Sequence, residues 1–130
     1  MNYLADTVAI VHHLRRPSRV GSECRRILRE ADEGQHHVFI SAISLMEVLY
    51  LAEAKRIALS LGDLLAMVSS SQNYSIVPVD SQVVEAAQTI DDVPELHDRI
   101  LAATAAVYAV SMLTPDAVMA ASQHVDAIWD

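Results

Sequence analysis

Short apolar segments with β-strand character alternate along the 130-residue chain with longer segments whose apolar residues recur at helical spacing. A chain that alternates in this way builds strand–helix–strand units, which place the strands in parallel and the helices on both faces of the sheet. We therefore predict an α/β fold with three layers, α/β/α, around a central and mostly parallel sheet. The expected strands are residues 3–6, 37–41, 74–79, 112–114 and 125–129.

Helices are expected between these strands. Pro17 ends the first helix and Gly34 the second, because proline disrupts a helix and glycine readily adopts the left-handed conformation that follows one. No repeat, low-complexity tract or linker interrupts the pattern, so residues 1–130 are interpreted as a single domain. The expected helices are residues 7–16, 19–33, 44–54 (capped by Ser41 or Ser44), 59–71, 81–87, 96–110 and 115–122.

The composition excludes several classes of function. With only three glycines, the chain has no room for a glycine-rich phosphate-binding loop or a dinucleotide fingerprint. A single cysteine, Cys24, excludes an internal disulfide and a cysteine-based zinc site. The apolar runs are shorter than the ~20 residues of a membrane-spanning helix, and no signal segment opens the chain. We expect a soluble, cytoplasmic protein without a membrane contact.

The charge is unevenly distributed. A net charge of −8 argues against a general nucleic-acid binder that relies on neutralising phosphates. Two interpretations of the basic residues remain open: they pair with neighbouring acids on a solvated helix face, or they form a local basic rim for a polyanion. Six of the nine lysines and arginines lie close together, namely Arg15, Arg16, Arg19, Arg25, Arg26 and Arg29.

Four acidic residues occupy positions that the predicted fold brings together. Asp6 and Asp116 each follow a strand, at the sheet edge where ligands bind in such folds. Glu47 and Asp98 lie on helices that lean toward the same edge. A carboxylate beside the core requires a compensating cation, and four carboxylates cannot compensate one another. The pattern predicts a divalent metal site, a raised pKa for at least one acid, and phosphodiester chemistry.

Three of these acids also have simple structural explanations. Asp6 is typical of a helix N-cap, and Asp116 follows Thr114 and a proline in an arrangement typical of a helix start with threonine as the cap. Asp98 is favoured near a helix N-terminus by the helix dipole. Glu47 resists such an explanation, because it shares its helix face with apolar residues.

Taken together, the segments resemble a PIN domain, and most closely the toxin nucleases of VapC type, over almost the whole chain. The resemblance rests on Asp6-Thr7 after the first strand and on residues 40–48, 96–105 and 113–116. It implies that the family's four acids correspond to Asp6, Glu47, Asp98 and Asp116, and that Thr7 and Thr114 occupy hydroxyl positions beside the metal site.

Two positions depart from the family pattern. Val8 stands where many relatives carry asparagine or histidine, which removes a polar contact beside the site. Pro115 replaces a small residue before the last acid, which could tilt that carboxylate. Neither departure removes an acid.

The resemblance implies a Mg²⁺- or Mn²⁺-dependent endoribonuclease that acts as the toxin of a toxin–antitoxin pair. It implies RNA as substrate, a homodimer, and a cognate antitoxin whose tail covers the acidic pocket. Arg99 either contacts a substrate phosphate or pairs with a neighbouring acid. The alternatives are a PIN nuclease that acts in RNA processing or on DNA, and a non-catalytic PIN-like interaction module. Apolar helix positions beyond the obvious needs of one core are compatible with a dimer surface, namely Val48, Leu49, Leu51, Leu59, Leu61, Leu64, Leu65 and Met67.

Overall fold

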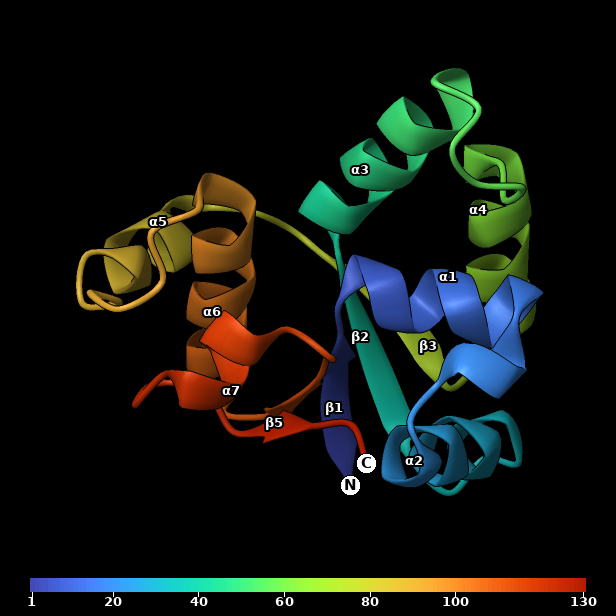
Figure 1. Cartoon of the computed structure of the whole chain (residues 1–130), viewed down its shortest axis with the longest axis horizontal. Helices are drawn as coiled ribbons and strands as arrows, with labels where there is room; N and C mark the ends of the chain where they lie inside the picture. Colours follow the sequence, from blue (N-terminus) through green and yellow to red (C-terminus); the bar gives the residue numbers. More distant parts are fainter.

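The computed structural model describes residues 1–130 and contains one five-stranded sheet with the order β3-β2-β1-β4-β5 (Figure 1). Every pair of neighbouring strands is parallel. The prediction of an α/β fold around a parallel sheet is therefore confirmed. The strands are β1 (Asn2–Ala5), β2 (His37–Ser41), β3 (Tyr74–Val77), β4 (Ser111–Leu113) and β5 (Ala127–Ile128).

Seven α-helices and one 3₁₀ turn connect the strands. None of the helices has both the length and the apolar character that crossing a membrane requires. The helical elements are α1 (Thr7–Arg15), the 3₁₀ turn η1 (Pro17–Arg19), α2 (Ser22–Asp32), α3 (Ala42–Glu53), α4 (Leu61–Ser70), α5 (Ser81–Ala87), α6 (Leu96–Tyr108) and α7 (Ala117–Ala121).

The sheet separates two apolar cores, one on each face. Along β1, Tyr3 and Ala5 point into the larger core with α1, α2 and α4, whereas Leu4 points into the smaller core with α5, α6 and α7. This alternation follows from the two-residue period of a strand. Figure 1 shows the two groups of helices on opposite sides of β1 and β2. All three residues are buried because β1 lies at the centre of the sheet.

Several expected elements differ from the observed ones at their ends, and the largest difference is the start of the second helix. The second helix begins at Ser22 rather than at residue 19, because Pro17–Arg19 forms a separate 3₁₀ turn with proline in its first position. The last strand is confined to Ala127–Ile128, the length over which it pairs with β4.

A pair of basic residues, Lys55 and Arg56, follows the C-terminal end of α3. Lys55 adopts a left-handed conformation, with φ of 58°. The amides of Lys55 and Arg56 donate to the carbonyls of Ala52 and Leu51, which closes the helix in the hydrogen-bond pattern usually built on glycine. The turn leads into α4 and leaves Lys55 and Arg56 exposed.

Candidate active site

Asp6 connects the central strand to the first helix. Its amide donates to the carbonyl of Leu113 in β4, at 3.1 Å, so the residue lies between the carboxyl ends of two neighbouring strands. One carboxylate oxygen accepts from the Ala9 amide at 2.8 Å and caps α1. The predicted N-cap role is correct, and the side chain is nevertheless only 7% exposed at the sheet edge.

Glu47 lies one and a half turns into α3, which begins directly after β2. The Thr7 hydroxyl oxygen lies 3.0 Å from Oε1 of Glu47 and 3.0 Å from the hydroxyl oxygen of Ser44. Thr7 has one hydroxyl hydrogen and a carboxylate only accepts, so when Thr7 donates to Glu47 it accepts from Ser44. This chain of hydroxyls fixes the Glu47 carboxylate against α1.

Asp98 lies in the first turn of α6. Glu95 is the N-cap of this helix, and its carboxylate accepts from the Asp98 amide at 2.7 Å. The connection from α6 leads into β4, which is parallel to β1, so the N-terminus of α6 reaches the edge of the sheet where β1 ends. Asp98 therefore approaches Asp6 from the opposite layer of helices.

Asp116 follows β4 and caps α7. Its Oδ1 accepts from the amides of Val118, at 2.7 Å, and Met119, at 3.3 Å. The expectation that Thr114 caps this helix is wrong: Asp116 is the N-cap, and the Thr114 hydroxyl accepts from the Asp116 amide at 3.1 Å. The helix begins after Pro115 because the side chain of Asp116 supplies the acceptor that its first amides need.

The four acidic residues line one cavity of about 170 Å³. Each comes from a different part of the chain, and Thr7 and Val8 stand beside them at the start of α1. Val8 is 44% exposed at this cavity, so the absent polar side chain leaves an apolar rim. The cavity is lined by Asp6, Thr7, Val8, Glu47, Asp98, Leu101, Pro115 and Asp116.

Two of the four acids are held in environments that disfavour their charge. Burial raises the pKa of Asp6 to about 6, with smaller increases from the charges of Asp116 and Asp98, against the lowering effect of hydrogen bonds from Thr114 and Ala9. The pKa of Asp98 also rises to about 6, first through burial and then through the charges of Asp116, Glu95 and Glu47. A raised pKa was predicted, but its main cause is burial rather than repulsion.

The carboxylates are spread around the cavity rather than clustered. The one group of three metal-binding side chains with donor atoms all within 4.8 Å of one another lies elsewhere, at Asp91, Asp92 and His124. No three of the four cavity acids are packed so closely, so one ion could contact at most two of them without side-chain movement.

Arg99 does not join this cavity. Its Nε donates to the carbonyl of Ala87 at the end of α5, at 2.9 Å, and it forms no ion pair with a carboxylate within 4.0 Å. The role of Arg99 as a substrate contact stays a prediction. His97 pairs with Glu95 rather than with Asp98.

Ser44 was missed as a site residue and was considered only as a helix cap. Ser41 caps α3 instead, with its side chain accepting from the Ile43 amide. Ser44 is fully buried and contacts Thr7. Its position three residues before Glu47, on the same face of the helix, was the available signal.

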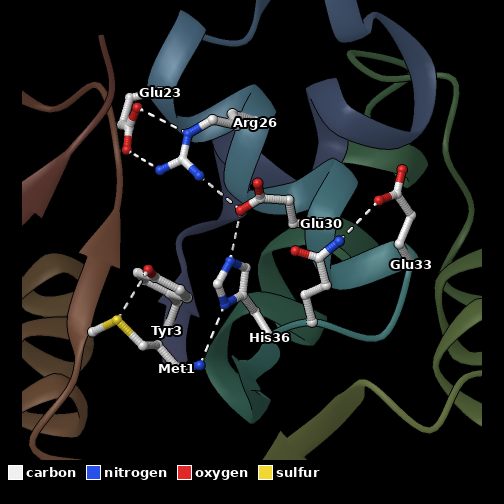
Figure 2. A network of polar contacts seen from close by, with 8 residues as sticks. Met1, Tyr3, Glu23, Arg26, Glu30, Glu33 and His36 are labelled. Carbon is white, nitrogen blue, oxygen red and sulfur yellow. Dashed lines mark hydrogen bonds and ion pairs between the residues drawn. The ribbon is translucent and has the colours of Figure 1, made fainter.

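The sequence left two interpretations of the basic residues open: ion pairing on a solvated helix face, or a basic rim for a polyanion. Different residues follow each of them. Figure 2 shows Arg26 on α2 bound to Glu23 and Glu30, with Glu30 also contacting His36, whose ring reaches the amino group of Met1. For Arg26 the solvated ion-pair interpretation is correct. Other basic residues gather elsewhere, in a cleft described below.

Comparisons with known proteins concern the family of the chain and its fold. A sequence model of the PIN domain matches residues 3–123. No curated protein sequence matches the chain. Among solved structures, VapBC2 from Rickettsia felis bound to a promoter DNA fragment matches with a TM-score of 0.76 at 15% identity, over 100% of both chains.

Two further structures match at similar levels. DNA-bound VapBC from Salmonella typhimurium gives a TM-score of 0.68 at 16% identity, covering 98% of this chain and 97% of that one. FitAcB from Neisseria gonorrhoeae gives 0.64 at 22% identity, covering 97% and 96%. At these identities the structures establish a shared fold, while the family match spans nearly the whole sequence. The chain therefore belongs to the PIN domain family.

Proposed function

We propose that this protein is a divalent-metal-dependent endoribonuclease of VapC type, the toxin of a toxin–antitoxin pair. The observation that carries the proposal is the convergence of four carboxylates on one cavity, with two of them held at a raised pKa by burial. Such a site gains stability from a bound cation, and it lies at the strand ends where α/β folds bind ligands. The PIN domain family supports nuclease activity.

The donor set fits Mg²⁺ or Mn²⁺. All four candidate ligands offer carboxylate oxygens, the cavity contains no cysteine or histidine, and hard divalent cations prefer oxygen. The wide spacing of the acids also fits, because Mg²⁺ keeps several waters and is commonly held by one or two carboxylates. When bound, such an ion lowers the pKa of water and offsets negative charge at a phosphodiester.

The side chains then have separate tasks. Asp6, Glu47 and Asp98 would hold the cation, at most two of them directly and the rest through water, and Asp116 with Asp6 would complete a second position once substrate phosphate is present. Thr7 orients the Glu47 carboxylate through the hydrogen bond at 3.0 Å. Thr114 donates to Asp6 and accepts from the Asp116 amide, so it links these two acids.

A protein partner is proposed from the surface beside the cavity. Met46 and Tyr50 are 56% and 61% exposed on α3, and with Leu51 and His97 they line an apolar groove of about 400 Å³ that also contacts Glu47. A toxin–antitoxin complex from Klebsiella pneumoniae is among the similar structures, with a TM-score of 0.64 at 19% identity over 95% of this chain and 94% of that one. We propose an antitoxin that covers this face, and a homodimer as in VapC-type relatives. Leu65, at 40% exposure, remains a candidate dimer position, whereas Val48, Leu59 and Leu64 belong to the core.

The test is cleavage of single-stranded RNA by purified protein in the presence of Mg²⁺ or Mn²⁺. Asp98→Asn should keep the fold and abolish cleavage, because it removes one ligand charge without changing shape. Asp91→Asn, a matched change in the acidic group outside the cavity, should cleave like the wild type. Cleavage that persists in Asp98→Asn, or that is unaffected by chelation, overturns the proposal. A DNA substrate assayed under the same conditions distinguishes an RNA nuclease from a DNA nuclease.

A further inference from the structure

A basic cleft lies at the opposite end of α1 from Asp6. It has a volume of about 360 Å³ and is formed between the C-terminal end of α1, the 3₁₀ turn η1 and the turn that follows α3. It gathers five of the nine lysines and arginines of a chain whose net charge is −8. The cleft is lined by Val11, His12, Arg15, Arg16, Arg19, Lys55, Arg56, Ile57 and Ala58.

One of the five cations fixes the walls of the cleft. Arg15 donates to the carbonyl of Ala58, at 3.3 Å, and to Asp63, at 2.9 Å, which joins α1 to the segment before α4. Asp63 is the single carboxylate that forms an ion pair with any of the five. Arg15 therefore shapes the cleft, and its own charge is compensated.

The other four cations have no carboxylate within 4.0 Å, and all four are exposed. These are Arg16, Arg19, Lys55 and Arg56. Arg26 differs from these four, because it binds Glu23 and Glu30 of its own helix, α2 (Figure 2). Arg25, Arg29 and Arg99 also form no ion pair, so the cleft is distinguished by the gathering of its cations in one place. Like charges gathered without acids repel one another, and a bound anion removes that repulsion.

The cleft shares its framework with the acidic cavity. Helix α1 begins at Asp6 and ends beside Arg16, and α3 carries Glu47 in its middle and Lys55 just after its end. Ten residues of helix separate Asp6 from Arg16, which corresponds to about 15 Å. Figure 1 shows α1 and α3 starting at the same edge of the sheet, and the two helices are in contact. A strand bound at the cavity and extended along these helices reaches the cleft within a few nucleotides.

We infer that the basic cleft binds backbone phosphate of the RNA strand, a few nucleotides away from the bond that is cut at the acidic cavity. This inference rests on the proposed function and extends it, since it assigns a second contact to the same substrate. Arginine suits the role because its planar group donates two parallel hydrogen bonds to phosphate oxygens. An acidic protein segment is a different occupant, and the test below distinguishes the two.

The cleft also resolves the conflict between a polyanionic substrate and an acidic protein. RNA that approaches the cavity meets four carboxylates, and the net charge repels it at long range. A separate cationic contact holds the strand while metal ions offset the charge in the cavity. Burial, with Arg19 and Arg16 nearby, lowers the pKa of His12, which leaves the charge of the cleft to arginine and lysine.

The first experiment measures binding of a labelled single-stranded oligoribonucleotide in EDTA, where metal-dependent cleavage does not occur. Arg16→Ala combined with Arg19→Ala should weaken binding about tenfold and reduce the slope of log affinity against log salt by roughly 0.7 for each lost phosphate contact. The matched control, Arg25→Ala with Arg29→Ala, removes the same charge from exposed positions on α2 and should bind like the wild type. Equal weakening in both double variants overturns the inference, because it indicates net charge alone.

Lys55→Gly provides a second variant that is secure against misfolding. Glycine accommodates the left-handed conformation of this position without strain, so loss of binding reports on the charge. We expect several-fold weaker RNA binding at unchanged thermal stability. Wild-type affinity for RNA in both Lys55→Gly and the double variant of Arg16 and Arg19 overturns the inference and assigns the cleft to another anion, such as an acidic peptide.

Substrate length separates the failure of this inference from the failure of the proposed function. For a long oligoribonucleotide, the double variant of Arg16 and Arg19 should raise KM and leave kcat unchanged. For a dinucleotide, which cannot span about 15 Å of helix, it should match the wild type. If the wild type binds RNA through the cleft and never cleaves it, the proposed function fails and this inference stands. If it cleaves and the variant is unchanged for long RNA, the inference fails alone.

Discussion

Two groups of acidic side chains in this protein are candidates for a metal site. They differ in how far neighbouring groups stabilise the negative charge, which the distances between the side chains do not reveal. Asp91 and Asp92 lie with His124 in a group whose donor atoms are all within 4.8 Å of one another. There Asp92 accepts from the hydroxyl of Ser122, at 2.7 Å, and from the Gln123 amide, at 2.8 Å. These bonds lower the pKa of Asp92. The charge of Asp92 is therefore stabilised by hydrogen bonds from the protein itself.

The acids of the cavity lie farther apart and are less well compensated. Burial and neighbouring charges raise the pKa values of Asp6 and Asp98 to about 6. The lesson is that close approach is a weaker sign of a metal site than unfavourable charge. A carboxylate satisfied by amides and hydroxyls has little to gain from a cation, whereas a buried carboxylate facing other carboxylates has much to gain.

The largest difference is expected in catalysis. Asp116→Asn preserves an acceptor for the cap of α7 but removes a charge from the cavity, so RNA cleavage should fall on the order of 10²–10³-fold. Asp92→Asn should leave the rate unchanged, because this side chain lies outside the cavity. The measurement is kcat for oligoribonucleotide cleavage in Mg²⁺. A comparable loss in Asp92→Asn would remove the distinction between the two groups.

Asp6→Asn and Asp92→Asn should change the stability of the metal-free protein in opposite directions. The folded-state pKa of Asp6 is about 6, against an ordinary value of 3.8, so its ionised form destabilises the metal-free protein at neutral pH. Asp6→Asn should raise the free energy of unfolding by up to about 3 kcal/mol in EDTA. Asp92→Asn should lower the melting temperature, because it loses favourable bonds to Ser122 and Gln123. Thermal unfolding of both variants measures the two signs, and a destabilised Asp6→Asn would contradict the account.

The pH dependence of folding stability should also differ between the cavity acids and Asp92. Asp6 and Asp98 have raised folded-state pKa values, so their ionisation costs more in the folded than in the unfolded protein. Their contribution is most favourable below about pH 4 and declines as the pH rises to about 6. For the half-buried Asp98 the change is on the order of 1 kcal/mol after screening by solvent. Asp92 behaves oppositely, losing its contribution as acid protonates it.

Melting temperatures of the metal-free wild type and Asp98→Asn at several pH values measure this effect. The advantage of Asp98→Asn over the wild type should be absent below about pH 4, grow as the pH rises toward 6, and stay constant above that. An advantage that is constant across the range would assign the effect to shape rather than to charge.

The smallest effect is expected from the residue that positions Glu47. Thr7→Val keeps the shape but removes the hydroxyl that donates to Glu47, and cleavage should fall roughly tenfold. Thr7→Ser should restore the rate. Ser122→Ala removes the corresponding hydroxyl from Asp92 and should not change cleavage. Full activity of Thr7→Val would show that Glu47 needs no orientation.

The sequence was most informative where a residue's environment follows from the strand–helix alternation. Asp6 and Asp116 follow β1 and β4, and parallel strands end at one edge, so their approach could be predicted. Local preference also accounts for Asp80, which caps α5 with its side chain accepting from the Val83 amide. Asp6 both caps α1 and lines the cavity, because its two carboxylate oxygens allow both contacts.

Other features depend on contacts between distant segments. Whether Thr114 or Asp116 caps α7 was decided by how the chain leaves β4, a choice of two residues that local preference does not resolve. The basic cleft required the turn after α3 to pack beside the end of α1, and this brings Lys55 and Arg56 to arginines some 40 residues away in sequence. The dominance of burial in the pKa of Asp6 likewise depends on tertiary packing.

Calorimetric titration with Mn²⁺ at neutral pH tests the central assignment most directly. The wild type should bind the ion saturably, Asp98→Asn should lose most of that binding, and His124→Ala should retain it. Binding that survives Asp98→Asn but disappears in His124→Ala would place the metal in the group of Asp91, Asp92 and His124 and contradict the account.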